Sequence, residues 1–203
     1  MYLLGERLLG VVILVLLGLL VAVKRVATRS VLDRPEGGLL VQSVNVFNLL
    51  FLLAVNPVAA VLLIARRLAT ADPTYTTVAL PGRTILEIAG LALYVAGFLL
   101  MAAALITLGH NYQLGGCAPR PGDSMVREGP YRLVRHPMYL AAWCISLGLA
   151  CLTQSWAAFG VFCIYVVLIL VLVPAEEEGL GRAYGEQYAT LQKETRRLVP
   201  FVY

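Results

Sequence analysis

Charged side chains are scarce in this chain. Among its 203 residues, 16 Lys and Arg and 12 Asp and Glu make up 14% of the sequence, whereas 60% is hydrophobic. Average globular domains carry about 25% charged residues, so too few polar side chains are present to cover a water-soluble domain. The apolar excess also excludes a disordered chain and a nucleic-acid binder, despite the net charge of +4. The composition is typical of an integral membrane protein.

Paired metal ligands are also lacking. The four cysteines, Cys117, Cys144, Cys151 and Cys163, show no CxxC spacing. Three of them lie in apolar segments, where cysteine behaves as a small hydrophobic residue. We therefore expect neither a metal site nor a disulfide framework. No internal repeat is present, which argues against an inverted-repeat transporter.

Long apolar runs predict three membrane spans in the first half of the chain, at about 3–23, 39–65 and 85–108. The first is not a signal peptide, because Lys24-Arg25 follows it where a small-residue cleavage site would stand. The second span contains four residues that kink a helix or give it a polar face: Asn45, Asn48, Asn56 and Pro57. These residues either line a lipid groove or pack against neighbouring helices.

The last apolar run, Pro137–Ala175, contains no charge over 39 residues. One straight helix of that length would be roughly 58 Å long, nearly twice a ~30 Å hydrocarbon core. The polar tripeptide Thr153-Gln154-Ser155 predicts a turn, which makes 138–173 a helical hairpin. The expected fold is therefore all-α, an integral membrane bundle of five transmembrane helices with a C-terminal cytosolic helix in the tail 174–203.

Five spans put the two termini on opposite sides of the membrane, and the distribution of Lys and Arg selects the orientation. Twelve basic residues fall on the side of the C-terminus: Lys24, Arg25, Arg29, Arg34, Arg120, Arg127, Arg132, Arg135, Arg182, Lys193, Arg196 and Arg197. Four fall on the other side: Arg7, Arg66, Arg67 and Arg83. We therefore expect the loop after the third span and the C-terminal tail to face the cytoplasm.

This loop ends in a string of functional residue types at 129–139. Pro137 suits the first turn of a helix and holds His136 extended just before it. Four further residues accompany them: Tyr131, Arg132, Arg135 and Tyr139. Arginines beside a helix N-terminus favour a carboxylate or phosphate ligand, and tyrosines can flank a flat ring or a cation. Each residue taken singly also has a simpler interpretation, as a topology anchor, an interfacial aromatic or a helix cap.

Three adjacent acids, Glu176, Glu177 and Glu178, directly follow the last span. They repel one another and oppose the helix dipole, so a nearby cation would offset that cost. For Glu178 we expect only a solvated turn that continues into an amphipathic helix. Because a hairpin brings its two ends together, the acids emerge beside the string 129–139. The resulting pocket, on the cytoplasmic side, suits a zwitterionic ligand with an aromatic ring.

The two motifs together resemble the isoprenylcysteine carboxyl methyltransferase family of membrane enzymes and its phospholipid methyltransferase relatives. The matching residues are Gly-Pro-Tyr-x-x-x-Arg-His-Pro-Met-Tyr (129–139), Glu-Glu-x-x-Leu-x-x-x-Tyr-Gly-x-x-Tyr (176–188) and Arg197-Leu198-Val199-Pro200. The resemblance covers roughly residues 109–203, whereas the first three spans match only in hydropathy. It implies a chain of two parts: 1–108 with those spans, and a catalytic half, 109–203, with a cofactor loop at 109–137.

The resemblance implies S-adenosylmethionine as cofactor and a lipophilic or prenylated acceptor that enters from the bilayer between helices. The cofactor site would consist of Met125, Val126, Tyr131, His136, Pro137, Met138, Tyr139, Glu176 and Glu177. Glu176 would meet the amino group of the cofactor, and Arg135 would brace the pocket or the cofactor carboxylate. We assign Arg135 and Glu176 to catalysis, and expect no metal and no nucleic acid.

Two positions depart from the family pattern. Leu172 stands where a basic residue is expected to meet the acceptor carboxylate, and Asp123 stands where a His is often found. A carboxylate nucleophile needs no general base, whereas an ammonium or a thiol must first lose a proton. We therefore expect methylation of the carboxylate of a prenylcysteine-like or other lipid acid. The alternatives are a phospholipid N-methyltransferase, a thiol S-methyltransferase, an NADPH-dependent membrane reductase of the sterol-reductase type, and a non-enzymatic scaffold or carrier.

Overall fold

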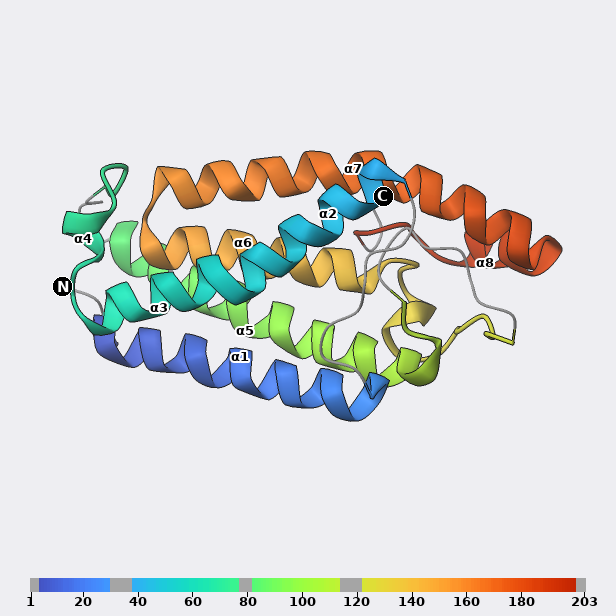
Figure 1. The fold of residues 1–203 in the computed structure, drawn as a ribbon, viewed down its shortest axis with the longest axis horizontal. Coiled ribbons are helices and arrows are strands. Elements are labelled where there is room, and N and C mark those ends of the chain that lie inside the picture. The colour runs from blue at the N-terminus through green and yellow to red at the C-terminus, as the bar shows by residue number, and fades with distance from the viewer. Residues whose placement is uncertain (1–3, 30–37, 77–81, 114–121, 200–203) are drawn as a thin grey trace.

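The computed structural model describes residues 4–29, 38–76, 82–113 and 122–199, and every regular element in these ranges is a helix. The long helices lie roughly parallel to one axis (Figure 1). Arg34, Cys117, Arg120 and Pro200 lie outside the described residues, as do parts of the expected cofactor loop and tail.

Among the residues that the structure describes, four helices are long and apolar enough to cross a membrane. They are α1 (Glu6–Thr28), the continuous helix Leu39–Ile64, the helix Gly82–Asn111, and α7 (Trp156–Tyr184). The apolar helix α6 (Pro137–Thr153) is shorter. The expectation of an all-helical protein of membrane type is thus confirmed. The helix Gly82–Asn111 ends in the 3-10 turn η2 (Gly109–Asn111), and three other helices are short: α4 (Leu68–Ala71), η3 (Gly129–Arg132) and α8 (Glu186–Glu194).

Small residues bring α6 close against α5 (Gly82–Leu108). A Cβ atom at Gly97 of α5 would lie 2.8 Å from the carbonyl oxygen of Ala141, and one at Gly148 of α6 would lie 2.7 Å from the backbone nitrogen of Tyr94. Such close approach is how helices gain packing energy in lipid, where no hydrophobic driving force acts between them. Most residues of α6 are buried in the bundle, whereas α5 also has an exposed face.

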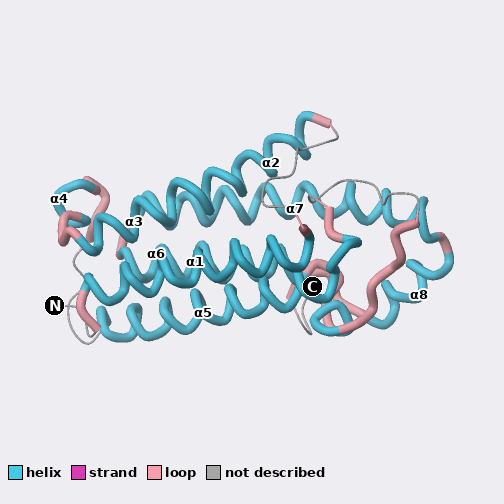
Figure 2. Tube along the Cα trace, turned by 60° about the horizontal axis from the view of Figure 1, so that its bottom comes forward, coloured by secondary structure: helices cyan, strands magenta, loops and turns pink. Residues whose placement is uncertain are grey.

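The second long helix changes partners along its length. Its first part, α2 (Leu39–Leu50), contacts α7, whereas its last part, α3 (Asn56–Ile64), packs on α1, and a π-helical turn, η1 (Phe51–Val55), joins them. The Asn56 side chain donates to the Phe51 carbonyl (2.8 Å) and accepts from the Tyr94 hydroxyl (2.7 Å). In Figures 1 and 2, α2 diverges from α1 toward the end of the bundle that carries α8.

The opposite end of the bundle holds the turn between α6 and α7. Gln154 adopts the left-handed conformation (φ 50°), and the Ser155 hydroxyl caps α7 by accepting from the Ala158 N–H (3.1 Å). At the α8 end, α7 continues beyond its apolar part. Its 29 residues make it roughly 43 Å long against a ~30 Å hydrocarbon core, so the acidic segment after Val173 extends past the apolar layer.

Candidate active site

A backbone pairing joins the segment before α6 to the C-terminal segment 195–199. The Arg135 N–H donates to the Arg196 carbonyl (2.7 Å), and the His136 N–H donates to the Arg197 carbonyl (3.0 Å). In the reverse direction, the Arg196 N–H donates to the Leu133 carbonyl (3.2 Å). These bonds fix His136 at the N-cap of α6, with Pro137 as the first helical residue. His136 has φ −123° and ψ 60°, so it lies outside the helical region but is not in the extended conformation expected before Pro137. Its N–H is therefore still available for pairing with the C-terminal segment.

Glu177 lies beneath this pairing and binds two arginines. Its Oε1 accepts from Arg135 Nε and its Oε2 from Arg197 Nε, each at 2.7 Å. The Arg135 guanidinium also donates to the Thr195 carbonyl (2.6 Å). His136 Nε2 lies 3.4 Å from Glu177 Oε1, without hydrogen-bond geometry. Both motifs and the C-terminal segment therefore meet at one buried carboxylate.

The Glu177 carboxylate lies past the apolar part of α7, and its environment favours the ionised form. Burial by itself raises the pKa of this carboxyl, but the contact with His136 and the hydrogen bonds from Arg135 and Arg197 outweigh burial. They lower the pKa of Glu177 to about 2. The like-charge repulsion expected among the three acids is thus offset at Glu177 by two arginines, while the exposed Glu178 pairs with Arg182 one turn on.

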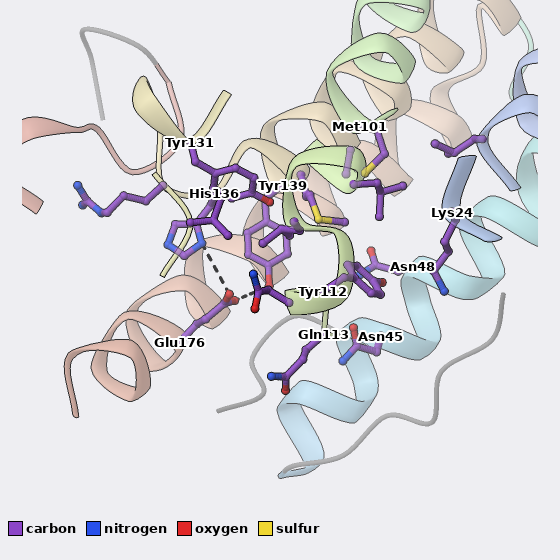
Figure 3. Close-up of a pocket in the computed structure, with 18 of the residues that line it drawn as sticks. Lys24, Asn45, Asn48, Met101, Tyr112, Gln113, Tyr131, His136, Tyr139 and Glu176 are labelled. Atoms are coloured by element: carbon purple, nitrogen blue, oxygen red, sulfur yellow. Dashed lines mark hydrogen bonds and ion pairs between the residues drawn. The ribbon is translucent and has the colours of Figure 1, made fainter. Parts of the chain in front are cut away.

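Glu176 points the other way, into a cavity. Its Oε2 accepts from the Tyr139 hydroxyl (2.5 Å), and its Oε1 lies 3.8 Å from His136 Nδ1. The rings of His136 and Tyr139 stack, with centroids 5.6 Å apart and planes 20° apart. The imidazole thus lies between the two carboxylates, and Figure 3 shows it together with Tyr139 and Glu176 at one end of the cavity.

Tyr131 completes this polar end from η3. Burial raises the pKa of its phenol, and the Glu176 charge and Tyr112 add to that effect. The phenol is therefore neutral at physiological pH and can act as a hydrogen-bond donor. This end of the cavity thus combines aromatic rings, the Glu176 carboxylate and an imidazole. Such groups can hold a cationic ligand that also carries a flat ring.

The cavity has a volume of about 520 Å³ and continues from this polar end into an apolar slot between α1 and α2. Four of its apolar residues are also exposed at the outer surface, between 40% and 53%: Val21, Val46, Leu49 and Leu53. The slot is therefore open to the surroundings at these residues. Its volume falls within the roughly 300–1,000 Å³ of small-molecule sites.

The structure brings most of the expected site residues together. Eight of them line the cavity: Met125, Val126, Tyr131, Arg135, His136, Met138, Tyr139 and Glu176. Pro137 and Glu177 do not appear in the lining: Pro137 is buried in the first turn of α6, and the Glu177 carboxylate is held by the two arginines. Arg135 does line the cavity, but its guanidinium donates to Glu177 and to the Thr195 carbonyl.

Sequence reasoning anticipated one side of the cavity only in part: it left the role of Asn45 and Asn48 open and missed Lys24, Tyr112 and Gln113. These five residues are the polar members of that side. In the sequence, Lys24 indicates only the orientation of the first span, and nothing in its local sequence indicates a cavity. Two roles were considered for the polar face of the second span: lining a groove and packing against neighbouring helices. Asn45 and Asn48 line the cavity, whereas Asn56 is fully buried in packing.

The two departures from the family pattern have clear positions. Leu172 is fully buried within the core of α7, so a charge at that position would have no access to water. Asp123 lines the cavity, and its carboxylate accepts from the Gln113 side chain (2.5 Å). The loop containing Met125 and Val126 is tied to η2, because the Ser124 N–H donates to the Asn111 side chain (3.1 Å).

Comparison with known proteins agrees with this geometry. The sequence model of the phospholipid methyltransferase family matches residues 85–187, about half of the chain. A protein-S-isoprenylcysteine O-methyltransferase A from Arabidopsis thaliana is 31% identical over 117 residues, 56% of this chain and 58% of that protein. A cobalt-zinc-cadmium resistance protein, CzcN, from Cupriavidus metallidurans is 26% identical over 102 residues, 50% of this chain and 47% of that protein. The chain thus spans about half the length of these curated relatives.

The fold is similar to a solved structure of the eukaryotic intramembrane Ras methyltransferase ICMT, an isoprenylcysteine carboxyl methyltransferase. The TM-score is 0.54 with 19% sequence identity, over 80% of this chain and 74% of that one. The resemblance drawn from the two motifs is therefore confirmed at the level of family and fold.

Proposed function

The chain belongs to the phospholipid methyltransferase family, and on that premise we propose that it is a membrane methyltransferase that uses S-adenosylmethionine to methylate a lipophilic carboxylate. One observation carries this proposal. A single cavity joins a polar end, where Glu176 and the His136–Tyr139 stack lie, to an apolar slot that opens toward lipid. A polar methyl donor and a lipophilic acceptor can therefore meet without leaving the protein.

The residues at the polar end fit S-adenosylmethionine by their chemistry. Glu176 offers a carboxylate to an ammonium group, and the Tyr139 hydroxyl holds that carboxylate in place. The rings of Tyr131 and His136 offer surfaces to a flat base and to a cation. Glu177 and Arg135 lie behind His136, on the side away from Glu176, where they position His136 and the start of α6.

When bound, S-adenosylmethionine supplies a methyl group from its positively charged sulfur. A lone pair of the acceptor oxygen forms the new bond to this methyl group, and the sulfur keeps the electron pair of the broken bond and becomes neutral. The protein has no proton to move if the acceptor is a carboxylate. Its task is to hold the reacting atoms in line, about 3–3.5 Å apart, and to exclude water. The apolar lining from α1, α2 and α5 supplies that exclusion.

The acceptor would reach the site sideways from the bilayer. Val21 of α1, Val46 and Leu49 of α2 and Leu53 of η1 all line the slot, and all four are exposed. An aliphatic chain lying between them would replace lipid contacts with protein contacts at little cost.

In this proposal α6 is a fifth membrane pass, short because it lies inside the bundle, and the chain divides at residue 108 into a membrane scaffold and a catalytic half. The excess of basic residues at the α8 end supports a cytoplasmic location for that end, with the cofactor site and the C-terminus. The cofactor would then arrive from the cytosol and the acceptor from the membrane.

The first test is binding of S-adenosylmethionine and S-adenosylhomocysteine to detergent-purified protein by calorimetry. We expect the wild type to bind, and Glu176→Gln to lose at least tenfold in affinity, because the variant removes the charge that faces the ammonium group. Glu178→Gln is the matched control, since Glu178 is exposed and pairs only with the neighbouring turn. A monodisperse wild type that binds neither compound would contradict the proposal.

The second test is transfer of a labelled methyl group to three acceptors: an N-acetylated prenylcysteine, palmitic acid and phosphatidylethanolamine. Methyl esters are released by mild base, whereas N-methyl groups are not. We expect base-labile label in one or both of the acids and none in the aminophospholipid. Stable label in the aminophospholipid would replace O-methylation with N-methylation.

A further inference from the structure

A second polar cluster lies in the cavity, apart from Glu176 and His136. It consists of Lys24 from α1, Asn45 and Asn48 from α2, and Tyr112 with Gln113 after η2. Figure 3 shows Lys24, Asn45 and Asn48 on one side of the cavity and His136 with Glu176 on the other, with Tyr112 between them. The cluster stands where the apolar slot meets the polar end.

Lys24 is the cationic member of this cluster. Its side chain is half-buried and its Nζ lies 5.2 Å from the centre of the Tyr112 ring, so it is turned toward the cavity. The next residue, Arg25, is exposed and donates to the Arg29 carbonyl on the outer surface of α1 (2.6 Å). Two adjacent cations thus point in different directions, and one of them enters the cavity.

The asparagines add hydrogen-bond donors beside Lys24. The Tyr165 hydroxyl donates to Asn48 Oδ1, which occupies the acceptor side of that amide and leaves the Nδ2 group as its donor side. Asn45 is buried and lines the same wall one turn earlier on α2. An ammonium group with amide donors in an apolar cavity favours an anion, because charge-assisted hydrogen bonds are stronger there than in water.

We propose that Lys24, with Asn45 and Asn48, binds the anionic head of the acceptor while its aliphatic chain lies in the slot between α1 and α2. This inference rests on the proposed methyltransferase function and deepens it. One carboxylate oxygen accepts from the Lys24 ammonium, and the other stays available as the nucleophile. Lys24 would supply the positive charge that the family pattern expects at position 172, where this chain has the buried Leu172.

The same geometry selects against amine acceptors. An ammonium head group placed beside Lys24 meets a like charge at short range, which costs binding energy in a low-dielectric site. Lys24 therefore makes the slot specific for lipophilic acids over aminophospholipids.

The kinetic test uses three variants of the full chain: Lys24→Met, Lys24→Arg and Arg25→Met. With the best acid acceptor, Lys24→Met is expected to raise KM about tenfold or more, with a smaller change in kcat. Lys24→Arg should restore KM to within a few-fold of wild type, and Arg25→Met should leave it unchanged. Binding of S-adenosylhomocysteine should be equal in all four proteins. An unchanged KM in Lys24→Met, or preferred methylation of phosphatidylethanolamine by wild type, would overturn the inference.

A binding test without cofactor separates this inference from the proposed function. The probes are a dansyl-labelled fatty acid and its uncharged primary amide, titrated by fluorescence into each protein in the same detergent. Wild type should prefer the acid to the amide, and Lys24→Met should lose that preference. If the preference is equal in both proteins, the inference fails even when S-adenosylhomocysteine binds. A Lys24-dependent preference in a protein that does not bind S-adenosylhomocysteine would support the anion site and contradict the methyltransferase.

Discussion

Arg135 Nε donates to Glu177 Oε1 at 2.7 Å, which ties the residue before His136 to the acidic end of α7 across 42 positions of sequence. Both side chains are almost fully buried, at 8% and 4% exposure. Glu177 also accepts from Arg197, so the pair anchors the C-terminal segment as well. This relationship supports a positioning role for Glu177 beneath the cavity, and it leaves Glu176 as the carboxylate that lines the cavity.

Replacing Glu177 by Gln should destabilise the folded protein. The change leaves Arg135 without its buried counter-charge, and breaking a buried ion pair in this way costs about 3–5 kcal/mol. We expect a clearly lower melting temperature in detergent, measured by intrinsic fluorescence. Glu178→Gln removes only an exposed pair, 75% and 67% accessible, and should change stability by about 0.5 kcal/mol or less. Equal melting temperatures for the two variants would show that the Glu177 ion pairs add nothing.

The contribution of Glu177 should disappear in acid. Its folded-state pKa is lowered to about 2 from an ordinary 4.5, so the stabilisation is fully present above about pH 5. It is lost as the pH falls from 4.5 toward 2, because protonation removes the charge that the arginines bind. Melting temperatures of wild type and Glu177→Gln should therefore converge over that interval. A gap of constant size would assign the effect of the substitution to packing.

Tyr139→Phe should weaken cofactor binding and leave the fold intact. The variant keeps the ring that stacks on His136 and removes the hydroxyl that donates to Glu176. A hydrogen bond to a charged group is worth about 1.5–3 kcal/mol, so S-adenosylhomocysteine should bind about tenfold less tightly or worse in calorimetry. Tyr75→Phe, at the far end of the bundle beside Ser155, is the control and should bind normally. Equal affinities in the two variants would contradict a positioning role for the Tyr139 hydroxyl.

Two glycine substitutions should change the stability of the folded protein in different ways. Gly97→Ala places a methyl group 2.8 Å from the Ala141 carbonyl oxygen and from Ile145 Cγ1, so α5 and α6 must separate. Overpacking of this kind costs about 1–3 kcal/mol. Gly160→Ala meets no heavy atom within 4 Å and should be neutral or stabilising by up to about 1 kcal/mol, because Ala is the better helix former. Thermal unfolding of both variants under one condition is the measurement. A Gly97→Ala variant as stable as Gly160→Ala would show that the α5–α6 contact is looser than described.

Much of the helical layout could be predicted from local sequence. The polar tripeptide 153–155 lies between α6 and α7, and Ser155 is the N-cap of α7. The expected third span, 85–108, overlaps α5, which begins three residues earlier at Gly82. These features depend on apolar run length and on capping residues, both of which are local properties.

The separate roles of Glu176 and Glu177 are harder to predict from the sequence. Glu176 and Glu177 are adjacent on one helix, so their side chains point about 100° apart. Which of them faces the cavity depends on where Arg135 and Arg197 arrive from other parts of the chain. The residues alone could therefore predict an acidic site at the end of α7. Only the family resemblance assigned the cofactor amino group to Glu176, and it placed Glu177 in the same cofactor site rather than beneath it.

The sequence by itself determined that this is a helical membrane protein with a dense polar end, because apolar run length, turn residues and the two motifs are all readable along the chain. Only the tertiary structure decided that Lys24 faces the cavity while Arg25 faces outward, and that Asn48 lines it while Asn56 is buried. These outcomes depend on how α1 and α2 pack against α5 and α7. A side chain's neighbours across a bundle come from distant segments, and no local pattern specifies them.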